Sequence, residues 1–275
     1  MDYGFNELSA LACRSQDSRI DDWFLMSSPV NITLITLAYI LVVLRVGPSL
    51  MKNRNAYNLR QTLAIYNFFQ IIYNFYLFVK VANVTQAITS LMKDDCKIER
   101  TDETVLECLT YAWLFLINKI IDFLDTIFMI LRKKNDQITF LHVYHHAAMV
   151  LIAWITLKYI GVREEFGIVG ALNAGVHVIM YFYYLVGAMG PQYQKYLWWK
   201  AYLTKIQIGQ FWVPQIYLIA IVVKGCQSPN ATMFWTITNT SVFILLFVNF
   251  YRKTYTSGQG MNEKGVRSEN IKKST

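Results

Sequence analysis

The four histidines of the chain lie where an imidazole could do chemistry. His142, His145 and His146 follow one another at offsets of three and four, which puts their rings on one stripe of a helix. The fourth, His177, shares a helical face with Asn173. An imidazole can act as a general acid or base, as a nucleophile that carries an acyl group, or as a ligand of a mononuclear zinc ion. The histidine pattern alone leaves these three chemistries open.

Three further ionisable residues lie inside an apolar stretch. Lys119, Asp122 and Asp125 follow one another at intervals of three residues, so they span about 120° of one helix face. Ionisable residues inside a membrane are costly and usually functional. We expect this face to look into a helix bundle, either as a structural ion pair or as part of a catalytic site. Four histidines cannot supply a di-iron centre without carboxylates, and the only ones available are Asp122 and Asp125. The four cysteines show no zinc-binding spacing, and we assign no metal ligand.

The composition is that of a membrane protein. Of the 275 residues, 55% are hydrophobic and only 16% are charged, whereas soluble domains carry about 25% charged residues. This excludes a soluble domain, a disordered chain and a small disulfide scaffold. The net charge of +8 is expected from basic cytosolic segments, and no motif indicates binding to nucleic acid.

Seven apolar stretches are long enough to span a bilayer as helices. The fold class is therefore all-α, with a transmembrane domain over residues 30–251, a segment 1–29 before it and a basic tail 252–275 after it. The predicted spans are 30–47, 62–82, 110–131, 139–157, 167–188, 202–223 and 232–251.

The charge distribution predicts which ends of the spans face the cytosol. The segments on one side hold 15 basic and 3 acidic residues, and those on the other side hold 9 basic and 13 acidic residues. The positive-inside rule makes the first side cytosolic, with the N-terminus luminal and the C-terminus cytosolic. The terminal pair Lys272 and Lys273 resembles a retrieval signal of the endoplasmic reticulum. We therefore expect a multi-pass protein of that membrane.

Four motifs, in order along the chain, resemble those of the ELO-type very-long-chain fatty acid elongases, which are membrane 3-ketoacyl-CoA synthases. Asp122 stands where that family usually has Glu, one methylene longer, and Val150 stands where Pro often follows the histidine box. The matching motifs are Lys119-x-x-Asp122-x-x-Asp125-Thr126, His142-Val143-Tyr144-His145-His146, Asn173-x-x-x-His177-x-x-Met180-Tyr181-x-Tyr183-Tyr184 and Thr204-x-x-Gln207-x-x-Gln210.

The resemblance implies both a fold and a reaction. The helices would enclose a closed acyl tunnel that opens to the cytosol, with a luminal disulfide between Cys96 and Cys226. An acyl-CoA would condense with malonyl-CoA to give a 3-ketoacyl-CoA, CO2 and CoA, with no redox cofactor. The HVYHH form of the histidine box resembles the subgroup with broad and polyunsaturated long-chain substrates.

The resemblance also implies roles for individual residues. His145 would attack the thioester, while His142, His146 and His177 would orient malonyl-CoA and stabilise negative charge. Lys119, Asp122 and Asp125 would hold the site geometry. Further supporting residues would be Asn173, Tyr181, Gln207 and Gln210, and candidates for contacts with the CoA phosphates are Lys134, Lys195, Lys200 and Arg252.

Other functions remain as alternatives. An acyltransferase of another kind or a non-catalytic lipid transporter could use the same tunnel, and a metal-dependent membrane oxidoreductase could use the histidines. A receptor would explain seven spans but not four histidines beside an intramembrane Lys–Asp–Asp face. The expected partners are membrane lipid and other enzymes of the elongation cycle, and a homodimer is compatible with the sequence.

Overall fold

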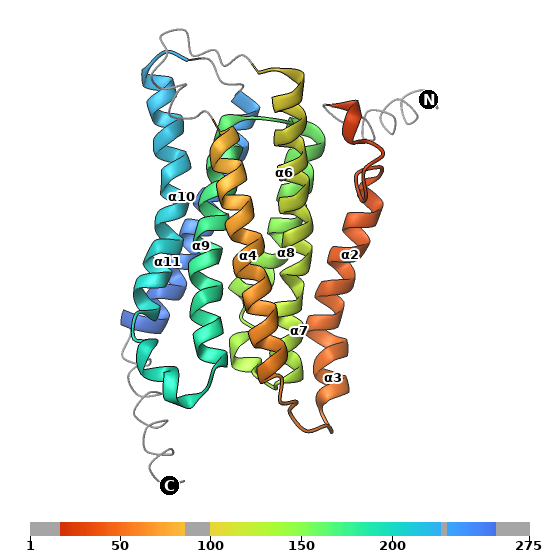
Figure 1. Cartoon of the computed structure of the whole chain (residues 1–275), viewed down its shortest axis with the longest axis vertical. Helices are drawn as coiled ribbons and strands as arrows, with labels where there is room; N and C mark the ends of the chain where they lie inside the picture. The colour runs from red at the N-terminus through yellow and green to blue at the C-terminus, as the bar shows by residue number, and fades with distance from the viewer. Residues whose placement is uncertain (1–16, 86–99, 227–229, 257–275) are drawn as a thin grey trace.

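Long helices lie side by side along the longest axis of the molecule (Figure 1). The computed structural model describes residues 17–85, 100–226 and 230–256, and every regular element in these ranges is helical. The described chain begins at one end of the bundle and ends at the other (Figure 1). An all-helical fold is the expected outcome for an apolar chain, because a helix satisfies its own backbone groups inside lipid.

The helix bounds follow the predicted spans closely. The α-helices are α2 (Pro29–Leu41), α3 (Gly47–Met51), α4 (Arg60–Val84), α6 (Asp102–Ile121), α7 (Phe123–Leu131), α8 (Phe140–Ile155), α9 (Glu164–Ala188), α10 (Lys200–Val223) and α11 (Asn230–Tyr251). Three π-helical turns extend them: Val42–Val46 joins α2 to α3, Thr156–Ile160 follows α8, and Arg252–Thr256 follows α11. Short 3-10 helices lie at Ser18–Ile20, Asn135–Gln137 and Pro191–Tyr196.

Six of these helical segments are long and apolar enough to cross a membrane. The predicted span 110–131 is not one of them, because the chain there is divided at Asp122 into α6 and α7. The α6–α7 pair nevertheless runs along the bundle beside the other helices (Figure 1). A polytopic helical membrane fold is therefore confirmed, while the count of seven spans stays a prediction.

The helices pack in a definite order around the interior. α4 lies along α9, α10 packs against both α9 and α11, and α8 contacts α2, α6 and α11. The largest apolar core is formed by side chains of α2, α3, α6, α7 and α8. The histidines of α8 and α9 and the charged residues of α6 and α7 are thereby brought into one bundle.

Local sequence determines where α8 begins and allows it to continue without a break through its centre. The hydroxyl oxygen of Thr139 accepts a hydrogen bond from the backbone N–H of His142 at 3.2 Å, which is the usual N-cap interaction. The histidine box therefore occupies the first turns of α8. The helix is unbroken through Val150, as expected where a proline is replaced by a residue that keeps its N–H.

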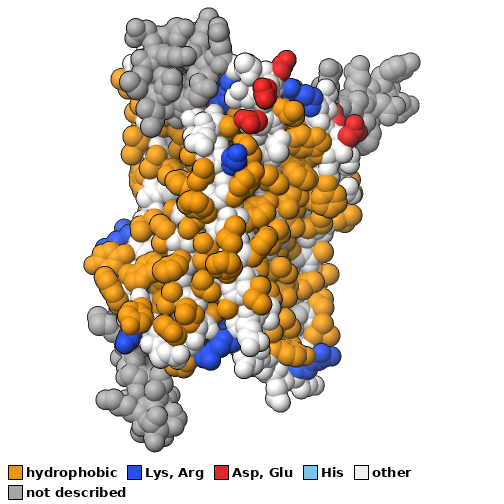
Figure 2. Space-filling view, viewed as in Figure 1, with side chains coloured by type: hydrophobic (Ala, Val, Ile, Leu, Met, Phe, Trp, Pro, Cys, Tyr) orange, Lys and Arg blue, Asp and Glu red, His pale blue; other side chains and the backbone are white. Residues whose placement is uncertain are grey.

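The surface separates a broad apolar band from charged ends. On the face seen in Figure 2, hydrophobic side chains cover most of the length of the molecule, the acidic groups gather at one end together with some Lys and Arg, and the charged groups visible at the opposite end are Lys and Arg. This pattern fits a bundle that crosses a bilayer with its basic end in the cytosol. Three sequence features lie outside the described residues: Cys13, Cys96 and the Lys272–Lys273 pair.

Candidate active site

Lys119 and Asp122 form a buried ion pair where α6 ends and α7 begins. The Nζ of Lys119 lies 2.8 Å from Oδ2 of Asp122, and the two side chains are only 2% and 1% exposed. Charges buried to this extent are tolerated only when they are paired and hydrogen-bonded. The shorter Asp122 side chain, which replaces the Glu of similar sequences, still reaches its partner.

Two further helices supply donors to Asp122. On Oδ1 it accepts hydrogen bonds from Nε2 of Gln70 at 2.6 Å and from the hydroxyl of Tyr181 at 2.9 Å. α4 and α9 are thus tied to the α6–α7 junction. Gln70 is not among the residues predicted for the site, although Asn67, Gln70 and Asn74 recur on one face of the predicted span 62–82, a pattern that could have identified it.

His177 lies beside this ion pair. Its Nδ1 is 3.3 Å from Nζ of Lys119 and 3.6 Å from Oδ2 of Asp122. An ammonium group only donates, so Nδ1 of His177 must be the acceptor and the ring proton must lie on Nε2. The prediction that the charged face of residues 119–125 looks into the bundle is therefore correct, and it meets His177 there.

Asp125 belongs to the same cluster. Its Oδ2 lies 2.7 Å from the hydroxyl of Tyr181, which therefore contacts both carboxyl groups. The ring of Tyr181 is fully buried and lies edge-on to His177, with ring centroids 5.8 Å apart. Tyr181 is the residue that joins the two carboxyls to α9.

The first histidine of the box is also hydrogen-bonded. Nε2 of His142 lies 2.9 Å from Oγ1 of Thr126, which in turn lies 2.9 Å from the hydroxyl of Tyr39. The ring of His146 packs on that of His142 with centroids 4.4 Å apart. Over the described residues, no three His, Cys, Asp or Glu side chains converge as metal ligands would.

His145 differs from its neighbours because its ring is enclosed but not hydrogen-bonded at Nδ1. This nitrogen is buried and has no hydrogen-bond partner. The ring lies edge-on to Phe243 and Phe247 of α11, with centroid distances of 5.1 and 5.8 Å. His145 is close enough to both Lys119 and His177 to interact with them electrostatically. The fold therefore brings the histidine box and His177 into one site.

A small cavity of about 50 Å³ lies between α8, α9, α10 and α11, and His145 is not itself part of its wall. Phe243, which contacts the His145 ring, is part of its wall, as are the side chains of Asn173 and Gln210. The side-chain oxygens of both amides are buried without a hydrogen-bond donor. Pro214, one turn after Gln210, also lines this cavity and cannot donate to the Gln210 carbonyl. The cavity thus combines an apolar wall with two unpartnered amide oxygens.

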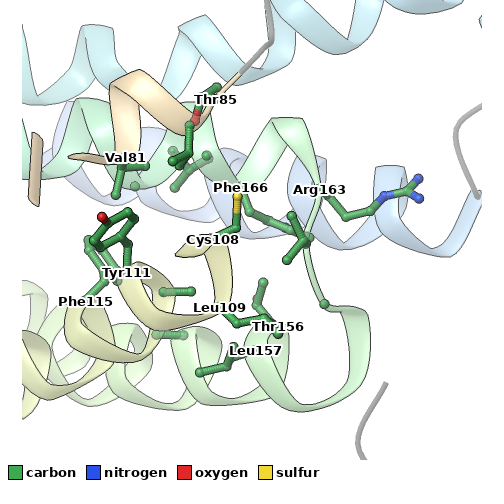
Figure 3. A pocket seen from close by; sticks show the side chains of 18 of the residues that line it. Val81, Thr85, Cys108, Leu109, Tyr111, Phe115, Thr156, Leu157, Arg163 and Phe166 are labelled. Carbon is green, nitrogen blue, oxygen red and sulfur yellow. The ribbon is translucent and has the colours of Figure 1, made fainter. Parts of the chain in front are cut away.

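A larger cavity of about 130 Å³ adjoins the first, between α4, α6, α8 and α9. Figure 3 shows its lining side chains, which are mostly apolar, among them Val81, Leu109, Tyr111 and Phe115. The two cavities share part of their walls, so they are neighbours inside the bundle. The shared residues are Met149, Ile152, Phe166 and Val169.

The end of the larger cavity that is farther from His145 carries polar side chains. Arg100 lines it, forms an ion pair with Glu164, and lies 2.6 Å from the sulfur of Cys108. Cys108, which also lines the cavity, is a free thiol. An ion pair at this position bounds the apolar part of the cavity.

Some predicted residues lie away from the cluster. Nε2 of Gln207 contacts Sδ of Met180 at 3.6 Å, and Gln207 is not part of either cavity wall. Cys226 is disulfide-bonded, but its predicted pairing with Cys96 stays a prediction. Of the four basic candidates for CoA contacts, Lys134 is half-buried and the other three are exposed: Lys195, Lys200 and Arg252.

Comparison with known proteins gives one consistent result. Residues 24–263 match the ELO: GNS1/SUR4 family. A very long chain fatty acid elongase of Aedes aegypti is 37% identical over 242 residues, covering 87% of this chain and 67% of the relative. Very long chain fatty acid elongase 7 of Rattus norvegicus is 36% identical, covering 90% and 88%, and very long chain fatty acid elongase 4 of Homo sapiens is 39% identical, covering 87% and 76%.

Proposed function

Because the chain belongs to the ELO (GNS1/SUR4) family, we propose that it is a fatty acid elongase, an acyltransferase that condenses a long-chain acyl-CoA with malonyl-CoA. The products are a 3-ketoacyl-CoA two carbons longer, CO2 and CoA. The observation that carries the proposal is His145, whose Nδ1 is buried and unpartnered and whose ring contacts Phe243, a residue in the wall of a largely apolar cavity. Such a cavity fits the tail of an acyl chain, and such a nitrogen is free to bond to its carbonyl carbon.

The first half-reaction is acyl transfer to His145. An imidazole nitrogen attacks the thioester carbonyl, the C–N bond forms, and the C–S bond breaks. The departing thiolate takes the remaining imidazole proton and leaves as CoA. No acidic cysteine or serine is needed for this step, because the imidazole itself is the nucleophile.

The second half-reaction uses the space that CoA has left. Malonyl-CoA loses CO2, its α-carbon attacks the acyl carbon, and the C–N bond to His145 breaks while the imidazole regains a proton. The enolate formed by decarboxylation carries negative charge on its oxygen. The Nε2–H of His177 is the donor best placed to stabilise it, because Lys119 occupies Nδ1 and fixes the tautomer. One proton is consumed per turnover.

The other polar residues support these steps. His142 is held by Thr126 and packs against His146, so both rings are positioned before substrate binds. Asn173 and Gln210 point amide groups with unpartnered oxygens into the cavity wall. They are candidate hydrogen-bond partners of malonyl-CoA or of the acyl carbonyl.

The CoA groups would bind at the basic end of the bundle. Lys195 lies in the connection from α9 to α10, Lys200 begins α10, Arg252 directly follows α11, and all three are exposed, while Lys134 precedes the histidine box. The α9–α10 connection lies at the end of the bundle at which α8 begins (Figure 1). Phosphate groups bind such side chains through charge-assisted hydrogen bonds. The chain is a multi-pass membrane protein, and we place it in the endoplasmic reticulum with this end in the cytosol, beside the enzymes that complete the elongation cycle. The reaction as written requires no cofactor.

The direct test is elongation by the purified protein in detergent. Radiolabelled malonyl-CoA is supplied with a panel of acyl-CoAs and no NADPH, and labelled 3-ketoacyl-CoA is measured. We expect product from the wild type and from Tyr144→Phe, a matched control one residue from His145 on the same helix with a partly exposed side chain. His145→Ala should give none. A folded wild-type protein that binds acyl-CoA but forms no product would contradict the proposal and favour lipid transport.

A further inference from the structure

The hydroxyl group of Tyr181 lies between two carboxyl groups. Its oxygen is 2.9 Å from Oδ1 of Asp122 and 2.7 Å from Oδ2 of Asp125, and the Tyr181 side chain is fully buried. Each of these short oxygen–oxygen contacts needs one hydrogen, but the hydroxyl has only one to donate. A second proton must therefore lie in this group of three side chains, because two bare oxygens at this distance would repel each other inside the bundle.

The donors around Asp122 show that it does not carry this proton. Its Oδ2 accepts from Lys119 at 2.8 Å, and its Oδ1 accepts from Gln70 at 2.6 Å as well as from Tyr181. Three donors on two oxygens, one of them an ammonium group, stabilise an ionised carboxylate. Asp122 is therefore the anion that balances Lys119.

Asp125 has different surroundings. Its hydrogen-bond partner is the hydroxyl group of Tyr181, its side chain is half-buried, and no ion pair joins it to a cation within the described residues. The other titratable groups that face it are Asp122 and Lys119 on its own face, Tyr39 from α2, Tyr66 from α4 and Tyr184 from α9. An ionised Asp125 would be a second negative charge beside Asp122, with one lysine for the two.

We propose that Asp125 is held as a neutral carboxylic acid that donates its proton to the hydroxyl oxygen of Tyr181. The Tyr181 proton then points only toward Asp122, and the cluster of Lys119, Asp122 and Asp125 has no net charge. A neutral cluster is what an apolar surrounding favours. The protonation of Asp125 therefore determines whether the Tyr181 hydroxyl donates its hydrogen to Asp122 or to Asp125.

This assignment makes Asp125 a positioning residue for the proposed elongation. The ammonium group of Lys119 donates one hydrogen bond to Oδ2 of Asp122 and another to Nδ1 of His177. If Asp125 were ionised, the Tyr181 proton would turn to it, and Asp122 would lose one donor and attract Lys119 more strongly. His177 would then lose the donor that fixes its Nε2–H toward the substrate. The consequence for catalysis rests on the proposed function, whereas the protonation state itself does not.

Infrared spectroscopy of the purified protein tests the protonation state without requiring activity. A buried carboxylic acid has a C=O stretching band that a carboxylate lacks, and aspartate labelled with carbon-13 shifts it. We expect this band in the wild type, its loss in Asp125→Asn, and its persistence in the double variant Lys119→Gln with Asp122→Asn, which removes the cation and its anion together. Absence of the band from the wild type, or its persistence in Asp125→Asn, would overturn the proposal.

Elongation rates provide a second, independent readout. Asp125→Asn keeps a neutral side chain that can still donate to Tyr181, whereas Asp125→Leu cannot donate. We expect Asp125→Leu to be slower than Asp125→Asn by about tenfold, the effect of one lost buried hydrogen bond. Equal rates for folded Asp125→Asn and Asp125→Leu proteins would overturn the positioning role. A wild type with the infrared band but no elongation would instead overturn the proposed function alone.

Discussion

The two halves of the site differ in where their charges and their unpaired polar atoms lie. Around Asp122, both carboxylate oxygens are hydrogen-bonded, and Lys119, Gln70 and Tyr181 converge on it from three helices, while the side-chain oxygens of Gln70 and of the neighbouring Asn118 are buried without a partner. The amide oxygens of Asn173 and Gln210, by contrast, are unpartnered in the wall of the small cavity, and Nδ1 of His145 is unpartnered behind Phe243 of that wall.

This difference indicates that the residues around Asp122 and those around the cavity have different roles. Buried polar groups are nearly always satisfied, so two unsatisfied amide oxygens in the wall of one cavity indicate a ligand that completes them. We interpret the Asp122 cluster as the scaffold of the site and the cavity side as the surface that meets substrate. Mutations on the two sides should then separate stability from activity.

The largest effect is expected from Lys119→Met. This change removes the cation and leaves Asp122 as a buried anion, which costs about 3–5 kcal/mol in free energy of unfolding. Thermal unfolding in detergent should show a large drop in stability, together with a loss of elongation.

The double variant Lys119→Gln with Asp122→Asn is the control for this prediction. It replaces both charges by neutral polar groups and should recover most of the stability but not the activity. A single Lys119→Met protein as stable as the wild type would show that the ion pair is not the scaffold of the site.

The opposite result is expected on the cavity side. Gln210→Leu removes a buried oxygen that has no partner in the protein, so stability should change by less than about 1 kcal/mol. If the amide completes its hydrogen bonds with substrate, elongation should fall by about tenfold or more. Loss of stability with unchanged kcat/KM would assign Gln210 to the scaffold instead.

A smaller, selective effect is expected from filling the larger cavity. A Cβ atom at Gly170, in the cavity wall, would lie 3.7 Å from Cγ1 of Val81, an ordinary contact distance. Gly170→Leu should therefore fold, and its side chain should shift the preference in the acyl-CoA panel to shorter chains, at about 1–3 kcal/mol for each excluded methylene.

Gly209→Leu on α10 is the matched control for the cavity change. A Cβ atom there meets no described atom within 4 Å, and Gly209 lines neither cavity, so chain preference should stay as in the wild type. An unchanged product profile for Gly170→Leu would mean that the acyl chain does not enter the larger cavity.

The smallest effects are expected at the basic end. Replacing Lys195, Lys200 or Arg252 singly by Gln should raise KM for both CoA substrates by about two- to fivefold, because exposed ion pairs are worth at most about 1 kcal/mol. The increase should shrink at high salt. Lys80→Gln, near the opposite end on α4, should leave KM unchanged, and equal effects at both ends would remove these residues from the CoA site.

The sequence predicted the residues of the site better than their contacts. The spacing of Lys119, Asp122 and Asp125 was sufficient to predict an inward-facing charged face, because helical periodicity depends only on the local chain. The division of the helix at Asp122 was not predictable from hydropathy, which shows a continuous apolar stretch from 110 to 131.

Contacts between helices could not be predicted, because they depend on how the bundle packs. The position of Tyr181 between two carboxyls and the lack of a partner at His145 Nδ1 arise from α9 and α11 meeting residues far away in the chain. The resemblance to elongases supplied a role for His145, and only the structure separated that residue from the paired His142.

Acylation of His145 is the measurement that tests the central claim most directly. The purified protein is incubated with a long-chain acyl-CoA and no malonyl-CoA, and its intact mass and peptide masses are determined. We predict a mass increase of one acyl group, located on the peptide that contains His145, absent from His145→Ala and discharged when malonyl-CoA is added. An active enzyme that gains no acyl mass, or gains it on a residue other than His145, would contradict the account.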